Sequence, residues 1–394
     1  MPTLEAYTLT SALGRGLRAT LSALQERRSG LRPCDFEDAD LPTWIGRVEG
    51  VEDVRLPDAL QAYACRNNQL AWLGLQQDDF IEAVQAARRR FGARRIGVFI
   101  GTTTSGIREA ETAYRHRDPH SGVLPDTFRY RTTHNGFSCT DFVRQTLGLR
   151  GPAQAVLTAC SSSAKAFAVA QRFMQMNLCD AAVVGGVDSL CLTTLYGFHA
   201  LQLLSSQPCR PWDAWRDGLS IGEAAGFALL YRNPSQHTAI RLLGYGESLD
   251  AHHITSPHPQ GAGAVLAMQR ALQSAGLTPQ DIDFISLHGT ATPANDAIED
   301  QAVHRLFGDR PPCASTKGWT GHTLGAAGIA AVVLACLGLE QGLLPGTLNT
   351  REVDPALRVA LQLENRPDTP RRVLVNAFGF GGNNCSLLLG KPAC

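Results

Sequence analysis

Residues 155–170 read Ala-Val-Leu-Thr-Ala-Cys-Ser-Ser-Ser-Ala-Lys-Ala-Phe-Ala-Val-Ala. The largely apolar run before Cys160 is typical of a buried strand, and the small residues after it favour a helix. This order predicts a strand that turns directly into a helix, with Cys160 at the helix N-terminus. Unpaired N–H groups and the helix dipole favour a thiolate there. Because the thiolate is the nucleophilic form, Cys160 is a candidate nucleophile, with a buried structural cysteine as the alternative.

The composition of the 394-residue chain narrows its class of function. Lys+Arg and Asp+Glu both number 36, so no basic excess indicates a nucleic acid partner. The 11 cysteines are scattered and include no Cys-x-x-Cys pair, which argues against a disulfide framework and for a reducing compartment. His252, His253 and His258 fit no common zinc spacing, and we expect no metal.

The sequence gives no indication of export or membrane insertion. Residues 1–7 contain no basic segment followed by an apolar core, so a signal peptide is not indicated. The longest apolar stretch, residues 329–339, is too short to span a bilayer and is interpreted as a buried helix. We therefore expect a soluble, cytoplasmic protein with no membrane partner.

Apolar runs alternate with helical patterns along the chain. Runs typical of buried strands occupy residues 96–100, 181–186, 225–231, 284–287 and 373–377. Residues 263–276 form a helical pattern that ends at a C-cap glycine, whereas residues 30–58 and 115–136 look like surface loops. Alternating strands and helices of this kind predict a layered α/β fold.

Two further segments carry polar residues where α/β enzymes place functional groups. His288 follows the apolar run 284–287, at the end of a predicted strand. His322 lies five residues after Lys317 and directly before a helix rich in glycine and alanine. Each histidine alone could be a loop or capping residue. With Cys160 they form a Cys-His-His set, with Lys317 as a nearby cation.

Small-residue helices follow two of these candidates. Residues 161–176 come after Cys160, and residues 325–341 come after His322. Small residues allow close helix packing, so the pair suggests a duplicated architecture whose site lies where the halves meet. The sequence itself shows no direct repeat.

Residues 376–384 read Asn-Ala-Phe-Gly-Phe-Gly-Gly-Asn-Asn. A strand that runs into such a turn leaves backbone N–H groups with little side-chain cover, which suits the binding of an oxyanion. An ordinary hairpin turn is the alternative.

In this order, these segments resemble those of the β-ketoacyl-acyl-carrier-protein synthases of the KAS I/II type, a branch of the thiolase-like superfamily. Residues 185–188, Gly-Gly-Val-Asp, and residues 210–218, Arg-Pro-Trp-Asp-Ala-Trp-Arg-Asp-Gly, extend the resemblance, which runs from about Gly101 to the end. It implies a thiolase-like layered α-β-α-β-α fold of two similar halves. Residues 1–231 would carry the nucleophile, and residues 232–394 the two catalytic histidines.

The resemblance also implies a reaction, a decarboxylative Claisen condensation. Cys160 would accept an acyl group from acyl carrier protein. His288 and His322 would bind the malonyl thioester and promote loss of CO2, and the enolate would then attack the acyl group. The implied pathways are fatty acid and polyketide or aryl-polyene-like biosynthesis. No cofactor is implied, since the phosphopantetheine arm arrives on the carrier protein.

Further roles follow from position in the family pattern. Lys317 is implied as a supporting cation, with Glu299 in its network. The N–H groups of Cys160 and Phe378 are implied as the oxyanion hole. The Phe378 ring is implied as a gate, with Phe380 in the same loop. Implied binding residues are Thr290 and Thr292 for the phosphopantetheine arm, Thr104 at the limit of the acyl pocket, and Arg66, Arg129 and Arg131 for electrostatic docking of the acidic carrier protein.

Three residues depart from the family pattern. Ala224 and Ala291 stand in place of glycines, and Asn383 stands in place of a threonine. None of these changes removes a catalytic group.

A homodimer is implied by the resemblance, with a heterodimer containing a chain-length-factor-like paralogue as the alternative. Two other functions stay open: a thiolase that uses coenzyme A, and a non-catalytic or partner-dependent subunit. Cys160 and both histidines argue against the non-catalytic subunit. Cys385, the candidate second thiolase cysteine, lies in a strand-like run and is interpreted as core.

Overall fold

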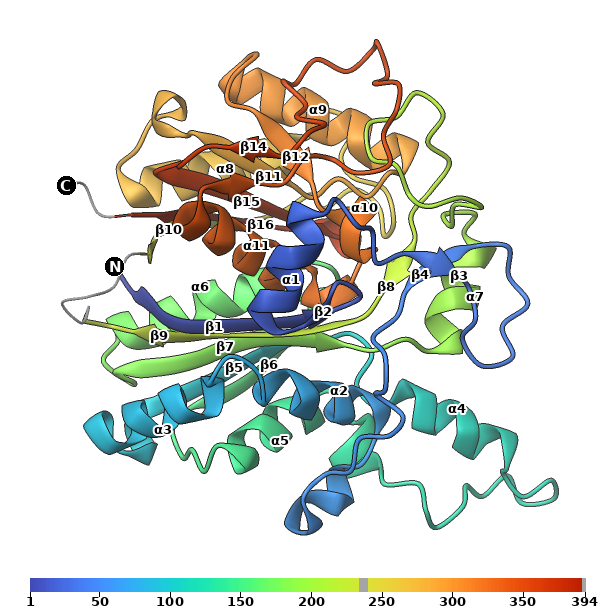
Figure 1. Ribbon diagram of the computed structural model, residues 1–394. Coiled ribbons are helices and arrows are strands. Elements are labelled where there is room, and N and C mark those ends of the chain that lie inside the picture. The colour runs from blue at the N-terminus through green and yellow to red at the C-terminus, as the bar shows by residue number, and fades with distance from the viewer. Residues whose placement is uncertain (234–239, 392–394) are drawn as a thin grey trace.

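The computed structural model describes residues 1–233 and 240–391 and has a mixed α/β architecture (Figure 1). Its central strands fall into two groups. The strands of the first group, in spatial order, are β1 (Thr3–Ser11), β9 (Ala224–Tyr231), β7 (Ala181–Asp188), β5 (Ile96–Gly101) and β6 (Ala153–Val156). Those of the second are β10 (Ile240–Leu249), β16 (Asn383–Gly390), β15 (Arg372–Gly379), β11 (Phe284–Leu287) and β12 (Cys313–Ser315).

The two groups share one pairing pattern. In the first, β1, β9 and β7 pair antiparallel, and β7, β5 and β6 then pair parallel. In the second, β10, β16 and β15 pair antiparallel, and β15, β11 and β12 then pair parallel. A short antiparallel contact between β1 and β10 joins them. The fold therefore consists of two similar halves, and the exact boundary between residues 231 and 232 stays a prediction.

We call the two groups of strands the first and the second sheet. Two buried helices separate these sheets, α6 (Ser162–Gln175) and α11 (Ala327–Gln341) (Figure 1). They pack against each other closely, since a Cβ on Gly328 would come within 2.5 Å of the backbone N of Ala164. The stretch Leu324–Gln341 is long and apolar enough to cross a membrane, but 89% of it is buried inside the protein. The prediction of a buried helix over residues 329–339 is confirmed.

Further helices cover the outer faces of the two sheets, which gives the layered α-β-α-β-α arrangement (Figure 1). On the first sheet these are α2 (Arg66–Leu75), α3 (Phe80–Phe91) and α5 (Ser138–Thr146). On the second they are α8 (Ala262–Ala275) and α9 (Pro293–Phe307). The remaining elements are α1 (Gly16–Gln25), α4 (Ile107–Arg115), α7 (Leu192–Ala200), α10 (Lys317–Thr320), β2 (Gly14–Arg15), β3 (Arg32–Pro33), β4 (Trp44–Gly46), β8 (Ile221–Gly222), β13 (Leu343–Leu344) and β14 (Arg366–Pro367).

One predicted surface loop is built into the fold instead. Residues 30–58 contain β3 and β4, and β4 pairs with β8. Phe36, Ile45 and Val51 of this segment are fully buried. The prolines of the segment exclude long elements, but its apolar residues still pack, so the prediction of a surface loop is wrong here.

Candidate active site

The turn between β6 and α6 presents Cys160. Ala159, the residue before it, adopts φ 52°, a conformation that non-glycine residues rarely use. Helix α6 begins at Ser162, two residues beyond Cys160. The predicted strand-to-helix turn is therefore present, and it is tight enough to set the direction of the Cys160 side chain.

Both predicted histidines meet Cys160 in a buried cluster. The His322 Nε2 atom lies 3.1 Å from the Cys160 Sγ atom. The rings of His288 and His322 stand edge to face, with centroids 5.3 Å apart. One donor atom from each of the three residues lies within 4.8 Å of the other two. Sulfur and nitrogen donors at this spacing could also hold a soft divalent cation, so the metal-free site stays a prediction.

His322 is held through its backbone. Its N–H donates to the carbonyl of Ser220 at 2.7 Å, and its own carbonyl accepts from the N–H of Gly222 at 2.9 Å. These two hydrogen bonds form an isolated parallel β-bridge between His322 and Ile221 of β8, which fixes the backbone of His322. The sequence contains no local signal for this contact, because the partners lie about a hundred residues apart.

Glu299 holds the other histidine from helix α9. Its two carboxylate oxygens accept from the N–H groups of His288 and Gly289, at 2.7 Å and 2.8 Å. Burial raises the pKa of Glu299 to about 7, against the lowering effect of these donors. Glu299 thus fixes the backbone that presents His288.

Burial keeps the reacting groups neutral. It raises the pKa of Cys160 to about 11, although the Phe380 N–H and the Lys317 cation act in the opposite direction. It lowers the pKa of His322 to about 3 and that of His288 well below its ordinary value, with Lys317 adding to both shifts. A neutral thiol faces neutral imidazoles at neutral pH, so the resting thiolate expected from the helix terminus is outweighed by desolvation.

The Lys317 cation lowers the pKa of all three residues of the cluster. It is buried, and burial lowers its own pKa, while Glu299 and Cys160 raise it. The structure thus brings Lys317 and Glu299 together around the cluster, where the resemblance implied them.

Two cavities meet at the nucleophile. The first, of about 370 Å3, contains Cys160 and both histidines in its wall, together with Thr290 and Thr292. The second, of about 330 Å3, is lined by Thr102, Thr103, Leu157, Ala159, Cys160, Phe198, Leu324 and Phe380. Cys160 can therefore be reached from two sides, which suits a residue that receives one substrate and passes it to another.

Phe380 stands at the boundary between the cavities. It lines both of them together with Cys160, and its ring stacks on Phe198 with centroids 5.6 Å apart. Its backbone N–H also faces the Cys160 sulfur. Phe378 lines the first cavity, where its ring lies 6.0 Å from that of His288. The geometry therefore favours Phe380 over Phe378 for both positions, and the roles of gate and second oxyanion donor stay predictions.

Thr104 lies behind the second cavity rather than in its wall. It is buried, and its hydroxyl donates to Asp188 at 2.9 Å, while Thr102 and Thr103 line the cavity. The Asp188 carboxylate also accepts from Thr102, Thr103 and the N–H of Gly325. Thr104 is not among the described residues that line either cavity, and its role at the limit of the acyl pocket stays a prediction. Asp188 holds the loop that contains Thr102, Thr103 and Thr104.

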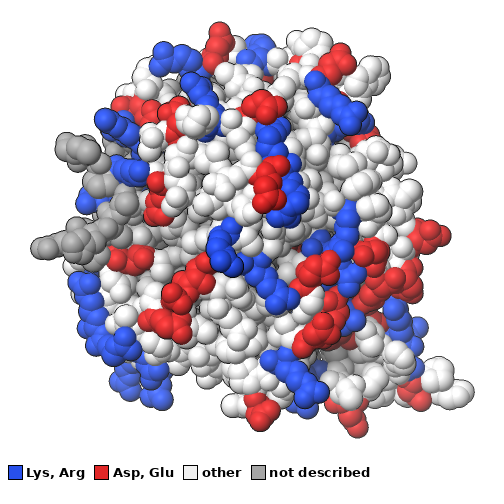
Figure 2. Space-filling model, in the orientation of Figure 1, with Lys and Arg blue, Asp and Glu red and all other residues white. Residues whose placement is uncertain are grey.

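Arg66 is buried and cannot dock a carrier protein. Its side chain is 2% exposed and forms an ion pair with Glu223 at 2.7 Å. Arg129 and Arg131 are exposed, so their docking role stays a prediction. On the face shown in Figure 2, basic and acidic side chains lie interspersed, as expected from their equal numbers, 36 each.

The family departures have local structural settings. Ala291 takes φ 68°, a conformation that favours glycine. Asn383 accepts a hydrogen bond from the Lys165 ammonium at 3.1 Å. Ala224 lies in β9 with an ordinary register between β1 and β7.

The fold, with two similar halves and a buried Cys-His-His cluster where they meet, is thiolase-like. Family models described as beta-ketoacyl synthase, N-terminal domain, and beta-ketoacyl synthase, C-terminal domain, match residues 64–235 and 240–351. The 3-oxoacyl-[acyl-carrier-protein] synthase 2 of Vibrio cholerae is 33% identical, over 97% of this chain and 97% of that protein. The chain belongs to the β-ketoacyl synthase family.

Two further relatives refine this similarity. The mitochondrial 3-oxoacyl-[acyl-carrier-protein] synthase of Arabidopsis thaliana is 38% identical, over 62% of this chain and only 57% of that protein. A solved structure of a ketosynthase, ApeO, in complex with its chain length factor, ApeC, from Xenorhabdus doucetiae matches with a TM-score of 0.90 and 36% identity. That match covers 99% of this chain and 98% of the other.

Proposed function

We propose that this chain catalyses the decarboxylative condensation of an acyl group, held on Cys160, with malonyl-acyl carrier protein. The products are β-ketoacyl-acyl carrier protein and CO2. The observation that carries the proposal is the contact of 3.1 Å between Cys160 and His322, with His288 in the wall of the same cavity.

In the first stage the acyl group moves to the enzyme. The Cys160 thiol loses its proton to solvent as its sulfur attacks the acyl thioester. The N–H groups of Cys160 and Phe380 bind the oxyanion of the tetrahedral intermediate. The C–S bond to the carrier arm then breaks, and the leaving thiolate takes up a proton from solvent.

In the second stage the malonyl thioester occupies the first cavity. The neutral imidazoles of His288 and His322 donate hydrogen bonds to its carbonyl oxygen and stabilise the enolate that forms as CO2 leaves. The enolate carbon attacks the acyl-Cys160 carbonyl, a C–C bond forms, and the C–S bond breaks. The Cys160 thiolate then takes up one proton, so decarboxylation supplies the electron pair and requires no oxidant or metal.

Intact-protein mass spectrometry tests the first stage directly. The protein is incubated with a panel of acyl-carrier thioesters, with and without malonyl carrier. We expect an acyl adduct that disappears when malonyl carrier is added. Cys160→Ala should lose the adduct, while Cys34→Ala, at a half-buried cysteine outside both cavities in the described structure, should keep it. Full condensation activity in Cys160→Ala would refute the proposal.

The histidines separate the two stages. His288→Ala or His322→Ala should leave Cys160 acylation largely intact and abolish malonyl decarboxylation. If acylation fails equally in both variants, the assigned roles are wrong.

The proposed pathway is fatty acid or polyketide biosynthesis, including aryl-polyene-like routes. The support is the similarity to a 3-oxoacyl-[acyl-carrier-protein] synthase and to a ketosynthase in complex with a chain length factor, and the preferred acyl chain in the adduct panel would distinguish the pathways. The phosphopantetheine arm of the carrier is the only prosthetic group in the proposal. A coenzyme A thiolase is less well supported, because Cys385 is fully buried in β16 and is not among the described residues that line either cavity.

We propose that a second chain covers the edge of the first sheet. Strand β6 is the last strand on that side, and Leu157, just beyond it, is 57% exposed although it lines the second cavity. A homodimer fits this edge. A heterodimer fits it as well, since the similar ketosynthase of known structure is in complex with a chain length factor. Light scattering of the purified chain decides between them: a dimer supports the first, and an inactive monomer supports the second.

The protein is also proposed to be cytoplasmic.

Docking of the carrier protein is proposed at Arg129 and Arg131. Acidic carriers would be attracted to exposed arginines in a salt-dependent way. Arg129→Glu and Arg131→Glu should raise KM for the carrier at low salt, whereas Arg89→Glu, exposed on α3, should not. An unchanged KM would place the docking surface elsewhere.

A further inference from the structure

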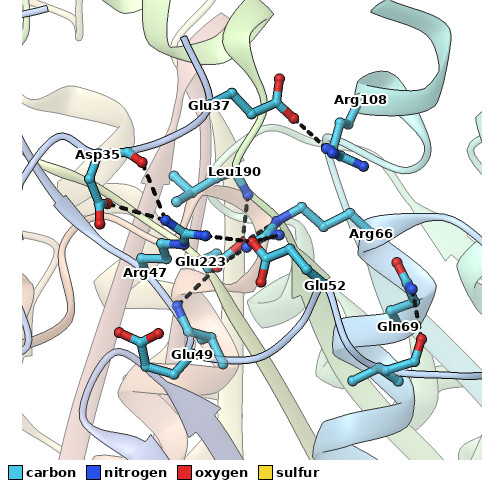
Figure 3. A network of polar contacts seen from close by, with 12 residues as sticks. Asp35, Glu37, Arg47, Glu49, Glu52, Arg66, Gln69, Arg108, Leu190 and Glu223 are labelled. Atoms are coloured by element: carbon cyan, nitrogen blue, oxygen red, sulfur yellow. Dashed lines mark hydrogen bonds and ion pairs between the residues drawn. The ribbon is translucent and has the colours of Figure 1, made fainter. Parts of the chain in front are cut away.

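A buried ion pair joins Arg66, the first residue of α2, to Glu223, the residue between β8 and β9 (Figure 3). The guanidinium of Arg66 donates to both carboxylate oxygens of Glu223, from Nη2 at 2.7 Å and from Nε at 3.1 Å. Its remaining nitrogen pairs with Glu52 at 2.6 Å, and Glu52 also pairs with Arg47. Arg66 and Glu223 are 1% and 0% exposed. A two-point contact of this kind fixes orientation as well as charge.

Glu223 connects separate parts of the chain. Its carboxylate also accepts from the N–H of Val48, just beyond β4, at 2.9 Å. It accepts from the N–H of Leu190, just beyond β7, at 2.8 Å. Its own N–H donates to the carbonyl of Gly46 in β4 at 2.9 Å. The carboxylate therefore holds β4, β8 and the end of β7 in one arrangement.

The segment that carries His322 rests on this arrangement. A Cβ on Gly46 or on Gly222 would come within 2.1 Å or 2.2 Å of the Thr320 carbonyl oxygen, so the two strands and this segment are in direct contact. His322 then exchanges backbone hydrogen bonds with Ser220 and Gly222 of the same strand region. Glu223, whose carboxylate is paired with Arg66, directly follows Gly222 in the chain. Any shift of β8 is passed to His322.

We propose that Arg66 and Glu223 form a positioning pair that holds His322 at hydrogen-bonding distance from Cys160. The pair touches no reacting atom and acts through β8. The inference rests on the proposed function for its kinetic readout, while the reactivity of Cys160 reports on the site independently of the reaction.

The test uses Arg66→Lys and Glu223→Gln in the full chain. Lysine keeps the charge but cannot reproduce the two-point contact, and glutamine keeps the shape but loses the charge. His322→Ala serves as the reference for a lost histidine. Val84→Ala, fully buried on α3 in the outer core, serves as a control for general destabilisation. Each protein is assayed well below its own Tm.

We expect the kcat of malonyl decarboxylation to fall by about 10-fold to 100-fold in both variants, the loss typical of a misplacement of about 1 Å. KM should stay close to wild type, because Thr290 and Thr292 lie on a different segment of the cavity wall. The iodoacetamide reaction rate of Cys160, followed by mass spectrometry, should move toward the value of His322→Ala. Val84→Ala should keep wild-type kcat and wild-type Cys160 reactivity.

Wild-type kcat and wild-type Cys160 reactivity in folded Arg66→Lys and Glu223→Gln would overturn the proposal. Equal losses in Val84→Ala would overturn it too, by showing a purely structural role. If Glu223→Gln does not fold, the double variant Arg66→Gln/Glu223→Gln, which leaves no unpaired charge, takes its place. If the wild-type protein shows no decarboxylation, the proposed function fails, and the Cys160 reactivity still decides whether the pair positions His322.

Discussion

The reactivity of Cys160 should follow its burial rather than its place at the start of a helix. Burial raises its pKa to about 11. At pH 8 about 0.1% of such a thiol is ionised, against about 24% for a free cysteine of pKa about 8.5. The difference of about 240-fold is partly offset, because the more basic thiolate is about 13-fold more nucleophilic at a Brønsted coefficient of about 0.45. Alkylation of Cys160 should therefore be about 20-fold slower than that of a free thiol.

The assay is the rate of iodoacetamide modification of the Cys160 peptide between pH 6 and pH 10. Restricted access lowers the rate equally at every pH, so the shape of the profile is the diagnostic. The rate should rise about tenfold per pH unit without a plateau, since the thiol stays below its pKa throughout. Lys317→Met should slow the reaction further, because the Lys317 cation lowers the pKa of Cys160.

A plateau with a midpoint near pH 8 or below would refute this reasoning. It would mean that the helix terminus and Lys317 outweigh desolvation, and that Cys160 and His322 form a resting ion pair. A faster reaction in Lys317→Met would contradict the electrostatic role given to that cation.

Three further predictions concern positions around the site. Ala291→Gly relieves a residue at φ 68°, a gain of about 1–2 kcal/mol. Unfolded-state freedom costs about 0.4–1 kcal/mol and the lost buried methyl group about 0.8 kcal/mol, so urea unfolding should show a change in stability of less than about 1 kcal/mol. Glu299 binds its proton more tightly when folded, with a pKa of about 7 against an ordinary 4.5, so its contribution to stability falls by about 3 kcal/mol as pH rises from 4.5 through 7. Glu299→Gln should remove that slope, and an unchanged slope in urea titrations would contradict the assignment. Gly379→Ala places a Cβ 2.8 Å from the Thr158 carbonyl oxygen and 3.2 Å from the backbone N of Cys160. Because this Cβ crowds the turn that presents Cys160, the variant should slow acylation of Cys160 in the mass-spectrometric assay far more than it lowers Tm.

Local patterns were enough to predict the elements that carry the site. The runs at 96–100, 181–186, 225–231, 284–287 and 373–377 all lie within strands of the structure. Buried strands and small-residue helices leave a strong signal, because every side chain of such an element must be apolar or small. The same argument located Cys160 and both histidines at element ends, where side chains remain free to act.

Residues held by distant partners could not be predicted in this way. Arg66 looks like a surface residue, since arginine is rarely buried unless it is paired, and its partner Glu223 lies 157 residues away. Phe378 and Phe380 are two residues apart, so strand alternation would place them on one face. Strand β15 ends at Gly379, however, and Gly381 takes φ 75°, which turns Phe380 toward the nucleophile. Only the folded loop distinguishes these two rings.

The duplicated fold explains why a neutral resting site can still favour an anionic transition state. Cys160 precedes α6, and His322 precedes α11, the equivalent helix of the second half. The two helices pack against each other, so both N-termini, the positive ends of the two helix dipoles, meet at the same place. Desolvation prevents a permanent charge on Cys160. Under the proposed function, the N–H groups of Cys160 and Phe380, which already face the sulfur, would stabilise an oxyanion as soon as it forms, with little reorganisation. Under that function, burial and the helix termini would act at different stages: burial sets the neutral resting state, and the positive helix ends would lower the barrier to the anionic transition state.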